Sequence, residues 1–426
     1  MKVIIFEDRG YEDLYPITYL RPSYALKSGA FTIFETMERE MGEGYEILLH
    51  CRSYMSAYLK ECFPDRVVNN IPSEDVMFLN GRFLMSKVLL PTFSDASKKD
   101  TVWTHNGDVL FAYVSAGKVA PLKDKAESQG DNVLSLKDFT DAGLNSEVVT
   151  KEDFSNDIIE IKYPWDIRRY FSYLLERDIM YRVRLNPTLL HVYDGMQIIS
   201  REDMMNINFG KAVNFYPNIV LDCKAGGIVI DDETEIEPYV FIKGPVFIGK
   251  NCKIKSGTKI YGPCYIGDHS KVAGEISASI FHSYVNKQHD GFIGDSYICP
   301  MVNLGADTVT SNLKNNYSNI KVKVSGEEID TGTQFLGSVI GDHSKFGINT
   351  MLNTGTSVGI FANVFGGGFP PKQIGSFSWN EIGKKPEKYD IEKALETAEQ
   401  TMSRRNLEVS SAYESLVRKL YEETAV

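Results

Sequence analysis

The chain has 426 residues, of which 43% are hydrophobic, 24% charged and 12% aromatic, a composition typical of folded globular proteins and not of disordered chains. This length exceeds one ordinary hydrophobic core, so two or three structural units are expected. The formal net charge of −11 disfavours a general binder of nucleic acid or of an anionic membrane, because the long-range field repels both.

The six cysteines form no CxxC pair and have no ligand spacing with histidine, so free buried thiols are expected instead of a zinc site. The opening MKVIIFEDRG reaches charged residues too early for the apolar core of a signal peptide. No stretch is long and apolar enough to span a membrane. We therefore expect a cytoplasmic protein.

Residues 1–185 have the pattern of a mixed α/β domain related to the Rossmann type. A short apolar strand is expected at residues 3–6, and strand-like and helix-like segments follow in turn, ending in a helix that begins at Pro164. Ile167, Tyr170 and Leu174 lie on one face of that helix. Residues 186–225 are expected to connect this domain to the next.

From Ile230 onward an aliphatic or aromatic side chain recurs every sixth residue. The series is Ile230, Ile236, Ile242, Ile248, Ile254, Ile260, Ile266 and Val272, then Ile298 and Leu304, then Ile340, Phe346, Leu352, Val358 and Val364. Neither a helix nor an ordinary strand has this period. It is typical of a left-handed parallel β-helix, in which each six-residue side of a triangular coil contributes one side chain to the central stack.

We assign the β-helix to residues 226–378 and a helical tail to residues 379–426, with an antiparallel sheet of regular turns as the alternative to the β-helix. The repeat is interrupted at about residues 273–292 and 312–336. We expect both insertions to leave the prism as loops, where chemistry tends to collect.

Polar side chains that a prism wall does not need gather where the repeat breaks and restarts. A histidine that titrates near neutral pH can accept a proton from an amine that attacks a thioester, amides can stabilise an oxyanion, and lysines can hold a phosphate. The alternative for His289 is a solvated loop side chain. The polar residues are His289, Asn303, Asn312, Lys314, Lys321 and Lys323.

This segment resembles the acetyltransferase half of the bifunctional glucosamine-1-phosphate acetyltransferase / N-acetylglucosamine-1-phosphate uridylyltransferase family. The family pattern has a histidine, a Gly-Asp pair, a VNIGAGT run and an asparagine, and this chain has His289, Gly294-Asp295, VNLGADT at 302–308 and Asn312. Two tyrosines of the family are replaced by Phe292 and Leu313, which leaves the acceptor sugar open.

The resemblance implies a role for several of these residues. His289 would be the general base, Asn303 and Asn312 would line the sugar-phosphate site, and Ala306 would lie beside acetyl-CoA. Lys321 is the candidate for binding phosphate.

The same family begins with a nucleotidyltransferase domain, whose glycine-rich loop wraps backbone N–H groups around the nucleotide phosphates. That loop is absent here. The segment in its place offers Arg9, Arg21 and Lys27, with an Arg-Pro pair at 21–22 that resembles degenerate bacterial relatives.

The family's Gly-Asp pair for Mg²⁺ corresponds to Gly81-Arg82, and the segment YPWDI leaves Asp166 as the candidate metal ligand. The resemblance thus implies a nucleotide or sugar-phosphate site at Arg21, Lys27, Gly81 and Arg82. Ion pairing within the fold is the alternative for Arg21, Lys27 and Asp166.

Taken together, the resemblance implies a transferase that moves acetyl from acetyl-CoA to an amino-sugar phosphate. It would also move a nucleotidyl group from an NTP to a sugar 1-phosphate, with Mg²⁺, if the first domain is active. A homotrimer with acetyl-CoA between subunits is implied. Two alternatives stay open: a nucleotidyltransferase alone, similar to glucose-1-phosphate thymidylyltransferases, whose β-helix only assembles the oligomer, and a non-catalytic binding protein.

Overall fold

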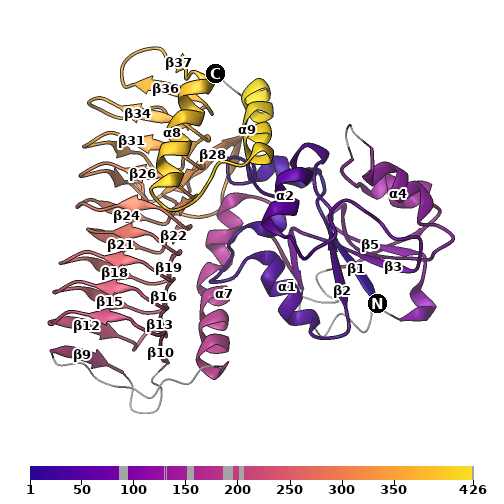
Figure 1. The fold of residues 1–426 in the computed structure, drawn as a ribbon, viewed down its shortest axis with the longest axis horizontal. Helices are drawn as coiled ribbons and strands as arrows, with labels where there is room; N and C mark the ends of the chain where they lie inside the picture. Colours follow the sequence, from indigo (N-terminus) through magenta and orange to yellow (C-terminus); the bar gives the residue numbers. More distant parts are fainter. Residues whose placement is uncertain are drawn as a thin grey trace. The chain divides into compact units, whose positions relative to one another are not determined.

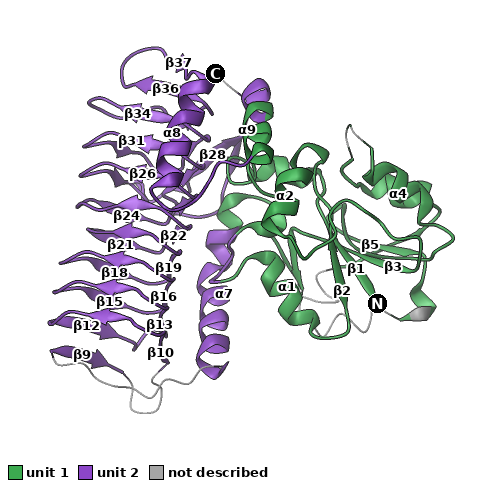
Figure 2. Ribbon diagram, viewed as in Figure 1, with its two compact units in different colours: residues 1–26, 31–166, 411–419 green, residues 27–30, 167–410, 420–426 purple. Residues whose placement is uncertain are grey.

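The computed structural model describes residues 1–85, 95–128, 130, 132–150, 158–185, 195–200 and 206–424 (Figure 1). These residues form two compact units (Figure 2). Unit 1 comprises residues 1–26, 31–166 and 411–419, and unit 2 comprises residues 27–30, 167–410 and 420–426. No helix within the described ranges is long and apolar enough to cross a membrane.

Unit 1 is built on a six-stranded sheet in the order β2-β1-β3-β6-β5-β7. The strands are β1 (Lys2–Phe6), β2 (Glu46–Leu49), β3 (Val76–Asn80), β5 (Thr101–His105), β6 (Asp108–Val114) and β7 (Asn145–Val148). Strand β1 pairs in parallel with β2 on one side and with β3 on the other. The chain therefore reverses its order beside β1, and in open α/β sheets such a switch point is where ligands bind.

Helices and a short ribbon complete unit 1. The helices are α1 (Ile33–Met41), α2 (Ser56–Cys62), α4 (Ala120–Ala126) and α5 (Leu136–Asp141), with 3-10 turns at Arg9–Leu14, Ser23–Ala25, Ser53–Met55 and Ala96–Lys98. Thr32 and Glu35 cap the start of α1 reciprocally, which satisfies two free N–H groups at that end. Strands β4 (Phe83–Met85) and β8 (Ile158–Glu160) pair antiparallel. The mixed α/β prediction is confirmed.

Unit 2 is a three-sided prism of parallel strands, the left-handed β-helix predicted from the period of six. One sheet has the order β10-β13-β16-β19-β22-β25-β30-β33-β35, the second β11-β14-β17-β20-β23-β26-β31-β34-β36-β37, and the third β24-β21-β18-β15-β12-β9. The separate pair β27–β32 has the same parallel pairing, whereas β36–β37 is antiparallel.

The strands of the first sheet are β10 (Ile207–Phe209), β13 (Ile228–Ile230), β16 (Val246–Ile248), β19 (Cys264–Ile266), β22 (Ile280–Phe281), β25 (Tyr297–Ile298), β30 (Ser338–Ile340), β33 (Thr356–Val358) and β35 (Gln373–Ile374). Those of the second are β11 (Asn214–Phe215), β14 (Glu235–Ile236), β17 (Lys253–Ile254), β20 (Lys271–Val272), β23 (Asn286–Lys287), β26 (Asn303–Leu304), β31 (Lys345–Phe346), β34 (Asn363–Phe365), β36 (Ser378–Glu381) and β37 (Glu387–Lys388). The third side is formed by β9 (Met196–Ile199), β12 (Ile219–Asp222), β15 (Phe241–Lys243), β18 (Lys259–Tyr261), β21 (Glu275–Ser277), β24 (Phe292–Gly294), β27 (Val309–Thr310) and β32 (Met351–Leu352).

All the period-six residues predicted from the sequence are buried in one core cluster. Two details differ from the prediction. The coils begin at β9, so most of the described part of the expected connector belongs to the prism. Residues 273–292 also stay in the prism, because Ile276, Phe281 and Ile293 continue the buried column with slightly shortened sides.

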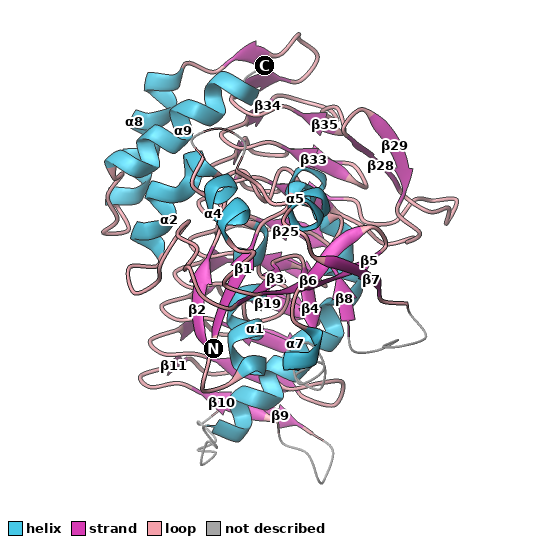
Figure 3. Cartoon of the chain, turned by 90° about the vertical axis from the view of Figure 1, so that its right-hand side faces the viewer, coloured by secondary structure: helices cyan, strands magenta, loops and turns pink. Residues whose placement is uncertain are grey.

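The second interruption does leave the prism, as predicted. Strands β28 (Lys321–Val324) and β29 (Glu327–Asp330) form an antiparallel hairpin that stands out beside the coils (Figure 3). Helix α7 (Pro164–Leu185) has most of its length in unit 2, where Arg182 binds Asp231 of the prism at 2.8 Å. The tail forms the predicted helices α8 (Ile391–Ser403) and α9 (Ser411–Thr424).

Candidate functional site

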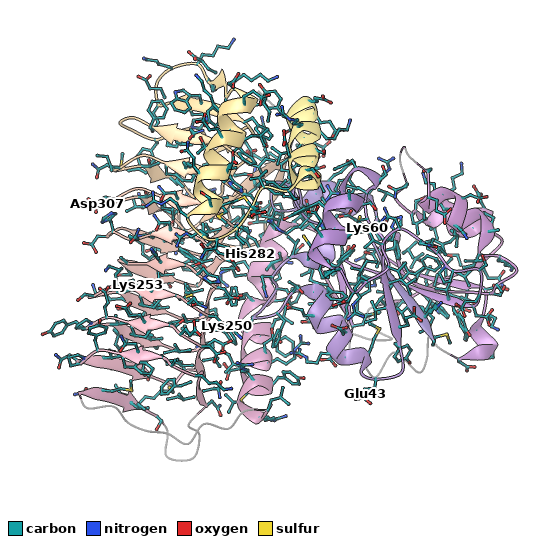
Figure 4. The ribbon with its side chains drawn as sticks, viewed as in Figure 1. Glu43, Lys60, Lys250, Lys253, His282 and Asp307 are labelled. Carbon is teal, nitrogen blue, oxygen red and sulfur yellow. The ribbon has the colours of Figure 1, made fainter. Side chains whose placement is uncertain are left out.

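His289 lies at an exposed corner of the prism, between β23 and β24. Asn286 pairs with Asn303 in the next coil, and the N–H of Asp307 donates to the carbonyl of Asp290 at 3.0 Å. His289 and Ala306 are therefore equivalent positions of consecutive corners. The structure brings these two predicted residues onto one edge of the prism, which Asp307 marks in Figure 4.

A groove of about 620 Å³ continues along the same edge. It crosses three successive corners, at Asp307, at residues 347–349 and at residues 365–368. The carbonyl of Ala306 accepts a hydrogen bond from the N–H of Asn349 at 2.8 Å, so Ala306 belongs to the groove's wall. The glycines at 366, 367 and 368 line one part of the groove and carry no side chains to fill it. Ile348 also lines the groove, and 69% of this residue is exposed. An extended, partly apolar ligand could lie along this edge with one end near His289.

Asn303 faces outward on the second sheet, just before this corner. Its Oδ1 accepts from Nδ2 of Asn286 at 2.6 Å, and the Oδ1 of Asn286 is buried with no hydrogen-bond partner among the described residues. Lys345 pairs with Asn303 in the following coil, and burial lowers the pKa of this lysine to about 8. The surroundings of Asn303 thus contain a buried acceptor and a partly buried amine.

Asn312 lies one side further along the coil, following β27. Its Nδ2 donates to Oδ2 of Asp295 at 2.7 Å, and Nε of Arg168 in α7 donates to Oδ1 of the same carboxylate at 2.7 Å. Asp295 is 4% exposed. Helix α7 therefore anchors Asn312 through a buried charge, which sequence reasoning missed. The structure places Asn303 and Asn312 on different sides of one prism.

Lys321, the predicted phosphate ligand, lies on β28 in the projecting hairpin. Its side chain is 54% exposed, and Nζ is 3.2 Å from Oε1 of Glu328 on β29. An exposed pair of this kind contributes little to stability and can exchange partners. The structure does not bring Lys321 to the edge that carries His289 within one chain.

In unit 1, the loops that follow β1 and β3 meet around Arg82. Its guanidinium donates to both carboxylate oxygens of Asp8 at 2.6 Å and to Asp108 at 2.7 Å, and it lies 3.8 Å from Glu160. Arg82 is 1% exposed. Although burial disfavours the charged form, the bonds to Asp8 and Asp108 raise the pKa of Arg82. Arg82 is therefore a neutralised structural cation and not an open phosphate ligand.

Glycines permit this arrangement at the switch point. A side chain at Gly10 would collide with the guanidinium of Arg82, and a Cβ at Gly81 would lie 2.6 Å from Cδ1 of Tyr24. Asn80 adds a bond from Nδ2 to Asp8 at 2.7 Å. A network of paired charges thus occupies the place where a glycine-rich loop would bind phosphates.

A second buried pair lies beside it. Nε of Arg52 donates to Glu7 at 3.0 Å, and its Nη2 donates to the carbonyl of Arg21 at 2.9 Å. Burial raises the pKa of Glu7, against the lowering effect of the Arg52 charge. Arg21 in turn uses Nη1 to bond the carbonyl of Ile17 at 2.9 Å.

Lys27 belongs to unit 2, where its Nζ donates to the carbonyl of Ala30 at 3.1 Å and lies 5.4 Å from the centre of the Tyr265 ring. Arg21 is assigned to unit 1. Asp166 is 6% exposed, and its Oδ2 accepts from the N–H groups of Lys162 and Tyr163 at 3.2 and 2.8 Å. This carboxylate closes the turn at the start of α7.

The residues present do not form a fitting Mg²⁺ site. Throughout the described ranges, no group of three or more His, Cys, Asp or Glu side chains is placed to hold a metal ion. Asp166 supplies one carboxylate that backbone N–H groups already use. A hard divalent cation needs several oxygen ligands, and this single carboxylate does not supply them.

Comparisons with known proteins agree with both halves of the fold. Residues 3–183 match the family described as sugar nucleotidyl transferase. A bifunctional sugar-1-phosphate nucleotidylyltransferase/acetyltransferase of Sulfurisphaera tokodaii is 31% identical over 160 residues, which cover 33% of this chain and 40% of that relative. A bifunctional protein GlmU of Methanococcus vannielii is 22% identical over 339 residues, covering 76% of this chain and 75% of the relative.

A solved structure titled as Arabidopsis UDP-N-acetylglucosamine acyltransferase aligns at a TM-score of 0.26 with 13% identity, over 55% of this chain and 90% of that one. This score is too low to support a conclusion. The fold and the family match define a sugar nucleotidyl transferase domain joined to a parallel β-helix. The chain is similar to proteins named bifunctional GlmU, in agreement with the resemblance found around His289.

Proposed function

We propose that unit 2 transfers an acetyl group from acetyl-CoA to the amine of an amino-sugar phosphate. The observation that carries this proposal is the edge on which His289, Ala306 and the groove follow one another in successive corners. The relative of Sulfurisphaera tokodaii that is named as an acetyltransferase supports the choice of reaction.

In the proposed reaction, the imidazole of His289 accepts a proton as the amine attacks the thioester carbonyl. The C–S bond then breaks, the acetyl group stays on nitrogen, and coenzyme A leaves as a thiol once it regains a proton. Asn303, on the second sheet in the next coil, would hold the sugar phosphate through its amide. A positioned base of this type contributes about 10²–10⁴-fold to the rate.

We propose a homotrimer, and the placement of the two asparagines supports assembly of more than one copy. Asn303 and Asn312 lie on different sides of one prism, so a single substrate could meet both only if a second copy of the chain supplied one of them. We propose that the groove is closed by the neighbouring subunit in this way. This makes the assembled trimer the active species.

A substitution in the groove should weaken the binding of acetyl-CoA selectively. Ile348→Asp places a carboxylate on the groove wall without disturbing the core, because this side chain is 69% exposed. We expect the KM for acetyl-CoA to rise at least about tenfold, with kcat little changed, because the change removes apolar binding surface. The control is Tyr239→Asp, 68% exposed on a distant coil. Equal KM values for both variants would remove the groove from the proposal.

A second reaction, nucleotidyl transfer from an NTP to a sugar 1-phosphate, is proposed for unit 1. The match of residues 3–183 to the sugar nucleotidyl transferase family favours it. The paired charges around Arg82 mean that the phosphates would be held by groups other than a glycine-rich loop. Pyrophosphate release from NTP and sugar 1-phosphate, with and without Mg²⁺, measures this activity.

Two substitutions of Asp166 distinguish a metal ligand from a structural carboxylate. Asp166→Asn keeps an oxygen acceptor for the N–H groups of Lys162 and Tyr163 and removes the charge. We expect any pyrophosphate release, and its dependence on Mg²⁺, to stay within about twofold of the wild type. Asp166→Ala should lower the free energy of unfolding by about 1 kcal/mol, as loss of a helix cap does. A large loss of activity in Asp166→Asn would restore the metal assignment.

A further inference from the structure

One position in the interior column of the prism holds a lysine. Lys287 pairs with Val272 of the preceding coil, which pairs with Ile254, so an aliphatic side chain is the rule at this position. Lys287 is 0% exposed. Its amine donates to the carbonyls of Ala273 at 3.1 Å and His289 at 2.7 Å. Because burying an amine costs free energy that an isoleucine would not, packing alone does not explain it.

At other corners of the same edge, a threonine hydroxyl supplies the hydrogen-bond donor. Thr258, Thr308 and Thr350 each donate through Oγ1 to the carbonyl three residues earlier, at 2.6, 2.8 and 2.8 Å. The backbone hydrogen bonds between coils align Gly274 and Gly291 with these threonines. Both glycines have positive φ, 78° and 121°, and a Cβ on either would collide with the backbone of the next coil.

The Lys287 amine therefore supplies a hydrogen-bond donor beside the two glycine corners, where a threonine side chain would collide with the backbone. A Cβ on Gly274 would lie 3.1 Å from Nζ of Lys287, so the amine fills the space next to the two glycine corners. One of its two acceptors is the carbonyl of His289 itself. The amine thus ties the residue that carries the imidazole to the interior of the prism.

We propose that Lys287 is a positioning residue, which fixes the corner from which His289 reaches the substrate. This inference rests on the proposed function of His289. The carbonyl and the imidazole belong to one residue, so a movement of this corner displaces the base directly. A displacement of about 1 Å can cost about a hundredfold in rate.

The environment of the Lys287 amine also predicts a second measurable property, the dependence of stability on pH. Asp290 and Asp307 favour the charged form, but burial is the larger effect and lowers the pKa of Lys287 from 10.5 to about 8. Between these values the unfolded chain binds more protons than the folded chain, so stability rises with pH over this interval. Below about pH 8 both states are protonated, and this contribution no longer changes.

Lys287→Met in the full chain tests the proposal, because methionine fills the interior with an unbranched apolar side chain. We expect kcat for acetyl transfer to fall about 10–100-fold, with KM for acetyl-CoA within about twofold. The rise in Tm between pH 8 and 10.5 should be smaller than in the wild type, because the contribution of Lys287 is lost and that of Lys345 remains. Thr258→Val is the matched control: it removes the equivalent hydrogen bond at a distant corner and should leave kcat within about twofold.

The imidazole signal of His289 in NMR spectra of histidine-labelled protein, assigned by its loss in His289→Ala, gives a readout independent of turnover. It should shift in Lys287→Met and stay in place in Thr258→Val. Absence of acetyl transfer by the wild type would defeat the proposed function, and the NMR signal would still decide the positioning role. An unmoved signal, or an unchanged kcat in Lys287→Met, overturns the proposal.

Discussion

Replacement of His289 by alanine is expected to lower kcat for acetyl transfer by about 10²–10⁴-fold, the usual contribution of a positioned general base. The KM for acetyl-CoA should change little, because the groove is lined by the corners at Asp307, 347–349 and 365–368. Since His289 is exposed at a corner, the Tm should stay within about 2 °C of the wild type. Thiol release from acetyl-CoA measures the rate.

His269→Ala is the control for this variant. His269 also stands at a corner, where its ring stacks on Tyr284 at 4.8 Å, but it lies between the first and second sheets, on another edge. It should retain the wild-type kcat. A His289→Ala enzyme with wild-type kcat would leave the solvated-side-chain interpretation as the correct one.

Replacement of Arg82 by methionine should destabilise unit 1 by about 3–5 kcal/mol, since it leaves buried carboxylates without their partner. Asp8 has only 9% of its side chain exposed, whereas Asp108 is 40% exposed and can recover water. Most of the loss therefore comes from Asp8. A phosphate-binding arginine, by contrast, would be dispensable for the fold.

Denaturant unfolding followed by tryptophan fluorescence measures this loss. Of the three tryptophans, Trp103 and Trp165 lie in unit 1, so a Trp379→Phe background makes the signal report on that unit. Arg9→Met is the control, because Arg9 is 63% exposed and lies 3.7 Å from Glu12; it should change stability by less than about 0.5 kcal/mol. A loss below about 1 kcal/mol for Arg82→Met would contradict the structural role.

The period of six made the prism predictable, because each interior position is a local property of the sequence. Phe209, Phe215 and Leu221 show the same period and face the strands that carry Ile230, Ile236 and Ile242. Leu221 and Ile230 lie nine positions apart instead of six, so the regular series starts late and the first coils are mistaken for a connector.

The candidate site was predictable only in part, for a different reason. The positions of His289 and Ala306 follow from counting corners along the chain. The bond between Arg168 and Asp295 joins residues 127 positions apart, and that between Arg82 and Asp8 joins residues 74 apart. No local sequence pattern encodes such pairs. Lys287 interrupts the apolar interior pattern, but nothing in the adjacent sequence indicates which carbonyls its amine bonds.

The most direct test of the proposed function is to incubate the full-length protein with acetyl-CoA and a series of amino-sugar phosphates and to identify the products by mass spectrometry. The account predicts an N-acetylated sugar phosphate and an equal amount of free coenzyme A with at least one acceptor, and neither product above background with His289→Ala. No acetylated product with any acceptor, from a trimeric and folded protein, would contradict it.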